Sequence, residues 1–212
     1  KTLDGLVEAG YLSSEQKLSS TTYRFVHDRI REGSYALLDS EEERLITHLS
    51  IGRRLRGAFG STPKSDELLL LVSQLNLGTA LMLDPDERRL LAELNYQAAE
   101  VAVLGSAFFP AAAFLGKGLT LLRDGDKTAS WSHHYALTLK LSIAKARMEY
   151  CCSRYDQSMA FADDVIKRAE TLDERQLAYN TKILCLESDL RASEGCSLAR
   201  DVLKEYGSPL PR

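Results

Sequence analysis

The chain has 212 residues, of which 44% are hydrophobic and 27% are charged, and its formal net charge is −3. This composition is that of a globular protein with room for one large domain or two small ones. The small negative charge gives no general attraction to nucleic acid or anionic membranes, and no apolar run approaches the roughly 20 residues of a membrane-spanning helix. We therefore expect a cytoplasmic protein with no nucleic-acid partner and no membrane partner.

The first 38 residues predict a mixture of helix and strand. Residue 1 is Lys and no signal peptide follows it, so we expect a piece of a longer protein. Apolar residues at helical spacing lead to Gly10, a residue type typical of the position after a helix. Residues 11–12 and 23–26 are predicted as short strands, joined by a polar loop over 13–22. This order predicts the end of a winged-helix subdomain with a short β-hairpin over residues 1–38.

From Asp28 onward the pattern is helical, and capping boxes mark several helix starts. In such a box the side-chain oxygen of the capping residue accepts a hydrogen bond from the backbone amide three residues later. The acidic side chain of that later residue accepts a hydrogen bond from the backbone amide of the capping residue. The candidate pairs are Ser40 with Glu43, Asp84 with Glu87, and Thr171 with Glu174. Residues 39–88 are accordingly predicted as connecting helices.

The second half of the chain predicts three similar helical hairpins, over residues 90–122, 133–169 and 174–206. The second helix of each hairpin begins with an aromatic or small residue, followed by a small residue three positions later and a larger residue three positions after that. This triplet recurs 47 residues later in the second hairpin and another 37 residues later in the third. The triplets are Phe108, Ala111, Phe114; Tyr155, Ser158, Phe161; and Ala192, Gly195, Leu198. Small residues allow close helix packing.

We predict an all-α protein in which residues 89–207 form an antiparallel helical-hairpin solenoid of the tetratricopeptide kind. Residues 208–212, with two prolines, are predicted as a linker. Tight packing between repeats is expected along Ala111–Gly118, where Ala and Gly reduce side-chain bulk. Four cysteines lie in this helical sequence and are expected to be reduced thiols that fill core space.

Several stretches, in this order, resemble a segment of large multidomain signalling kinases in which an AAA-like ATPase module of the STAND class precedes a helical repeat region. They are Phe25-x-His27-Asp28-Arg29-Ile30, Tyr35-Ala36-Leu37-Leu38, Glu42-Glu43, His48-Leu49, Ile51-Gly52-Arg53-x-Leu55, Leu71-Val72-Ser73-Gln74-Leu75-Asn76-x-Gly78, Asp84-Pro85-Asp86-Glu87-Arg88-x-x-Leu91-Ala92-x-Leu94-Asn95, Leu115-x-x-Gly118-Leu119-x-Leu121-Leu122, Trp131 and Tyr135. The resemblance implies a regulatory segment with an ATPase upstream and a sensor or kinase, often a histidine kinase, downstream.

The resemblance also implies a candidate nucleotide contact. His27 matches the histidine that ends the winged-helix strand in related ATPases and reaches the bound nucleotide's phosphates; Asp28 and Arg31 follow in the next helix. ATP or ADP would then bind the upstream domain of the parent protein, and this segment would hold no cofactor of its own. The alternative is that His27 only joins strand to helix while Asp28 caps it.

No catalytic or metal-binding set is recognised in the sequence. It lacks a phosphate-binding G-x-x-x-x-G-K-[ST] loop and the His-Arg-Asp and Asp-Phe-Gly motifs of protein kinases,. Adjacent His133 and His134 would point about 100° apart on a helix and could not easily share an ion. The basic run Arg53, Arg54 and Arg56 is predicted as a solvated helix face.

These observations favour a non-catalytic scaffold that relays conformational state and binds partners. The expected partners are neighbouring ATPase and kinase or sensor domains of the same chain, and other proteins or peptides. The alternative is the arm of a STAND-type transcriptional regulator, which would link an ATPase to a DNA-binding domain.

Overall fold

The computed structural model describes residues 3–17, 20–38, 40–123 and 129–208, which are mostly helical with one small antiparallel sheet. The chain divides into two compact units, residues 1–47 and 48–212. The predicted boundaries at residues 38 and 88 stay predictions, and most of the predicted 208–212 linker lies outside the described residues. No helix in the described part is both long and apolar enough to cross a lipid bilayer.

The first unit contains the predicted helix and β-hairpin. Its elements are α1 (Leu3–Glu8), β1 (Leu12–Lys17), β2 (Ser20–Phe25) and α2 (Asp28–Ala36). Gly10 has φ +75° just after α1, as predicted from its residue type,. The predicted polar loop over 13–22 was wrong, because most of it lies in the two strands, with Leu12 paired to Phe25. A solvated two-stranded ribbon pairs through its backbone and needs no apolar run.

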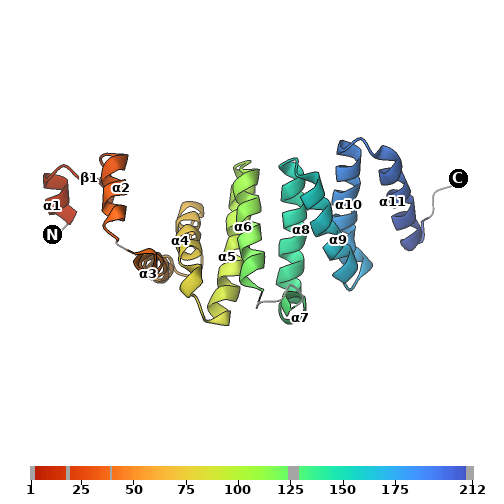
Figure 1. Cartoon of the computed structure of the whole chain (residues 1–212), viewed down its shortest axis with the longest axis horizontal. Coiled ribbons are helices and arrows are strands. Elements are labelled where there is room, and N and C mark those ends of the chain that lie inside the picture. The colour runs from red at the N-terminus through yellow and green to blue at the C-terminus, as the bar shows by residue number, and fades with distance from the viewer. Residues whose placement is uncertain (1–2, 18–19, 39, 124–128, 209–212) are drawn as a thin grey trace. The chain divides into compact units, whose positions relative to one another are not determined.

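The second unit is helical in its described residues, and its helices follow one another in chain order in Figure 1. They are α3 (Glu41–Phe59, which crosses the unit boundary), α4 (Ser65–Leu77), the 3₁₀ turn η1 (Thr79–Leu81), α5 (Pro85–Leu104), α6 (Phe108–Leu121), α7 (Ala129–His133), α8 (Tyr135–Cys151), α9 (Tyr155–Arg168), α10 (Leu172–Ser188) and α11 (Ala192–Glu205). Helices α5 and α6, α8 and α9, and α10 and α11 pack as pairs, and α6 packs on α8 and α9 on α10.

Helix starts follow the capping prediction with one exception. Ser40 Oγ accepts the Glu43 amide at 3.1 Å, and Thr171 with Glu174 forms the full box at the start of α10. Asp84 caps α5 with Pro85 at the first helical position. The prediction for Glu87 was wrong, because its carboxylate accepts two hydrogen bonds from Arg53 instead.

The three helix pairs share one turn geometry. After α5, α8 and α10 a single residue adopts the left-handed conformation, at φ 57°, 58° and 60° for Ser106, Ser153 and Leu190. The next amide then donates to the carbonyl five residues back, at 2.8–2.9 Å, in all three turns. This satisfies helix-end carbonyls in the Schellman manner. The turns recur at offsets of 47 and 37 residues, the offsets of the predicted triplets.

Within those triplets the middle residue is the buried one. Ala111, Ser158 and Gly195 are all buried, while the larger residues three positions later are only half-buried. The small residue therefore lies where the second helix of each pair meets its partner, as the sequence predicts. The larger predicted architecture, a tetratricopeptide-like solenoid, stays a prediction.

Among the glycines of the three helix pairs, Gly118 makes the closest approach, on the helix predicted for tight packing between repeats, and a still closer approach lies outside these pairs. Gly118 is close to its neighbours, since a Cβ there would lie 3.0 Å from Leu141 Cδ2 and 3.3 Å from a backbone oxygen of α5. A Cβ on Gly78 would lie only 2.7–2.9 Å from Leu49 backbone and Cβ atoms, and one on Gly52 2.5–2.7 Å from the Leu75 side chain. Helix α3 and the end of α4 thus meet at two glycines.

We predict that Gly78→Ala lowers the free energy of unfolding by about 1–3 kcal/mol, because the added methyl meets backbone atoms of Leu49 that cannot rotate away,. Gly57→Ala is the matched control: Gly57 lies inside α3 with nothing near its Cβ position, so alanine should be neutral or stabilise by up to about 1 kcal/mol,. Urea unfolding of both variants checks this, and equal stabilities would contradict the crossing.

Candidate functional site

The nucleotide-contact candidates lie on the surface of the first unit. His27 is the exposed N-cap residue of α2, and its side chain makes no capping hydrogen bond. Asp28 is the first residue of α2, rather than its cap, and pairs with Arg31 at 3.3 Å. Both partners of that ion pair are largely exposed. The structure therefore leaves the His27 side chain open to solvent, and its role as a nucleotide contact stays a prediction.

Residues of the family-like stretches meet around α3, α4 and α5. His48 Nδ1 lies 2.8 Å from Gln74 Oε1, and the side-chain amides of Asn76 and fully buried Asn95 exchange two hydrogen bonds at 2.8 and 2.9 Å. A buried amide needs such partners. Together with the two glycines of the helix crossing, these contacts hold α3, α4 and α5 together, which gives the family-like stretches a structural role.

Arg53 extends the same contact to the start of α5. Its guanidinium donates to both Glu87 carboxylate oxygens, at 2.8 and 2.7 Å. This bidentate hydrogen bond lowers the pKa of Glu87 and raises that of Arg53. Arg54 and Arg56 are exposed, as predicted for a solvated face, whereas Arg53 has this structural partner.

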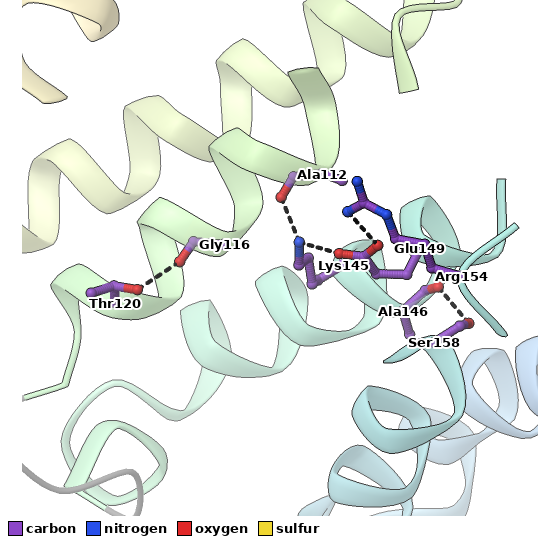
Figure 2. A network of polar contacts seen from close by, with 8 residues as sticks. All are labelled: Ala112, Gly116, Thr120, Lys145, Ala146, Glu149, Arg154 and Ser158. Carbon is purple, nitrogen blue, oxygen red and sulfur yellow. Dashed lines mark hydrogen bonds and ion pairs between the residues drawn. The ribbon is translucent and has the colours of Figure 1, made fainter. Parts of the chain in front are cut away.

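A buried charge network joins α6, α8 and the start of α9 (Figure 2). At its centre is Glu149, which is 1% exposed. Its carboxylate pairs with Lys145 one turn earlier in α8 and with Arg154 Nη1 at 3.2 Å. Lys145 Nζ also donates to the Ala112 carbonyl of α6 at 2.8 Å. A buried carboxylate without partners would be strongly disfavoured, and the two cations supply the partners of Glu149,.

The two cations also lie against aromatic rings. The Arg154 guanidinium lies 5.1 Å from the Phe109 ring centre of α6, and Lys145 Nζ lies 5.8 Å from the Phe161 ring centre of α9. Both distances are in the range of cation–π attraction. Two of these contacts link the α8–α9 pair to α6: the hydrogen bond from Lys145 to the Ala112 carbonyl and the contact of Arg154 with the Phe109 ring. They restrict how one pair can shift on the next, and the ion pairs with Glu149 hold both cations in place for them.

The cysteines divide into two classes. Cys152 and Cys185 are buried, as predicted, but Cys151 and Cys196 are exposed, so the prediction of four core thiols was wrong for two of them. Burial is the largest cause of the raised pKa of both buried thiols. A raised pKa favours the protonated thiol, which is a poor nucleophile. Within the described ranges no three His, Cys, Asp or Glu side chains are grouped for metal binding.

A groove of about 490 Å³ lies between α9, α10 and α11. Its apolar lining includes Met159, Leu186 and Leu198. Charged residues stand at its edge; Lys182 pairs with Asp163 at 2.6 Å, and Arg191 pairs with Glu194 through two hydrogen bonds of 2.9 and 2.8 Å. This hollow has the mixed character of a surface that contacts another molecule.

The chain is similar to one curated signalling protein, the hybrid signal transduction histidine kinase G of Dictyostelium discoideum. The two are 25% identical over 204 residues, which cover 87% of this chain but 6% of the kinase. No protein-family model matches the chain, and no solved structure matches it significantly. The similarity supports a signal-transduction context.

Sequence reasoning missed both the charge network and the groove. The i, i+4 spacing of Lys145 and Glu149 was visible but is usual for an exposed helix face. Only the presence of α6 on one side and α9 on the other buries this pair. The groove similarly depends on three helices whose separation no local pattern encodes.

We predict that Glu87→Gln lowers stability at neutral pH by roughly 0.5–1 kcal/mol and that the loss disappears in acid. The folded pKa of Glu87 lies below its ordinary value of 4.5. Its contribution is therefore complete above about 4.5 and is lost as the pH falls through the lowered value. Chemical unfolding of both proteins from neutral to acid pH measures the gap, and a gap independent of pH would contradict this assignment.

A second prediction concerns the buried network. Lys145→Met alone should cost about 3–5 kcal/mol, because it removes one of the cations that balance buried Glu149. The double variant Lys145→Met, Glu149→Leu should recover most of that loss, since it removes both buried charges. A double-mutant cycle by urea unfolding measures the coupling, and purely additive losses would show that the two groups act independently.

Proposed function

We propose that the chain is a non-catalytic regulatory segment of a multidomain signal-transduction kinase. In this role it relays conformational state between neighbouring domains and binds protein partners. The observation that carries the proposal is the similarity to a hybrid histidine kinase along nearly the whole chain. The chain spans 6% of that relative, so kinase chemistry and ATP binding would belong to other parts of the protein.

The contacts between helices support a relay. Helix pairs that share one turn geometry follow one another, and the Glu149 network makes the contact between α5–α6 and α8–α9 specific. A movement of one pair must either carry the next pair with it or break the hydrogen bond from Lys145 to the Ala112 carbonyl and separate Arg154 from the Phe109 ring,. A stack of such pairs, as in a tetratricopeptide-like solenoid, would transmit a shift along its length.

The residues with the best-defined polar geometry support a structural rather than a catalytic role. Glu149, Asn95 and Glu87 each bond to side chains or backbone groups of neighbouring helices. No specific observation favours the alternative role as an arm of a transcriptional regulator. His27 remains the candidate for a contact with a nucleotide that is bound in another domain of the parent protein. We expect that parent protein to be cytoplasmic.

The proposal predicts that the purified chain does not hydrolyse ATP, whereas altering its buried network changes kinase output in the whole signalling protein. The variant Lys145→Met, Glu149→Leu removes the ion pairs, and Gly57→Ala is the control with no altered contact. Histidine autophosphorylation with labelled ATP measures the output. Turnover by the isolated chain would contradict the non-catalytic role, and unchanged autophosphorylation in a folded network variant would contradict the relay.

A further inference from the structure

The groove and the buried network are equivalent places in successive helix pairs. The shared turns align α8–α9 with α10–α11 at an offset of 37 residues, and α6 with α9 at an offset of 47. Under this alignment the two cations recur: Lys145 corresponds to Lys182, and Arg154 to Arg191. The lining of the groove therefore has a template within the same molecule.

The groups around the two cations differ between these places. Glu149, the buried acid of the network, corresponds to Leu186 in the apolar lining of the groove. Phe109, whose ring faces Arg154, corresponds to Asp156 at the edge of the groove. In the groove the cations pair instead with exposed acids, Lys182 with Asp163 and Arg191 with Glu194. Exposed pairs of this kind hold their partners weakly.

The most consequential difference is the missing aromatic ring. Arg154 and Arg191 have similar side-chain exposures of 45% and 43%, but only Arg154 has a ring of its own chain against its guanidinium. In the groove, Asp156 replaces that ring, which leaves the guanidinium beside a hollow of about 490 Å³ with apolar lining residues. An aromatic ring of a bound partner could make with Arg191 the cation–π contact that Phe109 makes with Arg154 in the preceding pair,.

The charges around the groove define the rest of the ligand. Its lining carries three carboxylates, Asp156, Asp163 and Glu194, against the two cations Lys182 and Arg191. Lys182 pairs with Asp163, and Arg191 pairs with Glu194 and, at 3.8 Å, with Asp189, while the exposed Asp156 adds its negative charge near Arg191. The excess of negative charge favours a basic group of the ligand near Asp156 and disfavours an acidic one.

We propose that this groove binds a protein segment that presents an aromatic side chain next to a Lys or Arg. The ring lies on the Arg191 guanidinium against the apolar lining, and the basic group pairs with Asp156. This inference rests on the proposed function, since it specifies the chemistry of a partner that the regulatory segment binds.

The test is selection of peptides from a random phage-displayed library on the immobilised 212-residue chain, followed by fluorescence-anisotropy titration of the synthesised winners. We expect enriched sequences in which an aromatic residue neighbours Lys or Arg. Ala160→Trp, which fills the groove, and Asp156→Lys, which reverses its edge charge, should each weaken binding about tenfold or more. Asp201→Lys makes the same charge change on the exposed face of α11 and should leave affinity unchanged.

One further variant separates the ring from the charge. Asp156→Phe supplies in the groove the ring that Phe109 supplies to Arg154, so it should weaken binding more than Asp156→Asn does. Winners that are acidic, lack aromatic residues or bind Ala160→Trp equally well would overturn the proposal, as would a library that yields no specific winner. That outcome would not affect the autophosphorylation test, which decides the regulatory role without reference to this groove.

Discussion

Close contact between the two helices of each pair is the constraint on which the second unit depends. A left-handed residue ends the first helix, and a small residue, such as Ser158, then lets the second helix lie against it. Ser158 also makes two hydrogen bonds at this position: its hydroxyl donates to the Ala146 carbonyl at 2.7 Å and accepts from the Cys185 thiol of the next pair at 3.2 Å. A larger side chain there would separate the helices and remove the contacts that follow along the chain.

Once the pairs are formed, the contacts between them differ in chemistry. Around Glu149 two successive pairs are joined through Lys145 and Arg154, which contact α6 and are held by the buried Glu149 carboxylate,. At the corresponding place in the next two pairs the ions are exposed and a groove remains. One repeated geometry therefore provides a firm contact in one place and an open surface in the next. This division is compatible with the regulatory role proposed above.

The family-like stretches obtain a physical meaning from the structure. Gly52 and Gly78 are glycines because α3 and the end of α4 approach within contact distance of their backbones. The Asn76–Asn95 amide pair joins α4 to α5. These residues therefore maintain the geometry of the helices that begin the second unit.

The sequence by itself determined the helices, their caps and the equivalence of the three pairs, because these depend on residues a few positions apart. Helical spacing and capping chemistry predicted the start of α10 at Thr171, and the triplets predicted that small residues allow two helices to approach closely. Two local predictions failed, the loop over 13–22 and the role of Glu87, because backbone pairing and a distant arginine competed with the local pattern. Only the tertiary structure decided which charges are buried and where a hollow remains. Burial depends on helices brought together from separate parts of the chain, and that distance in sequence leaves no local pattern to read.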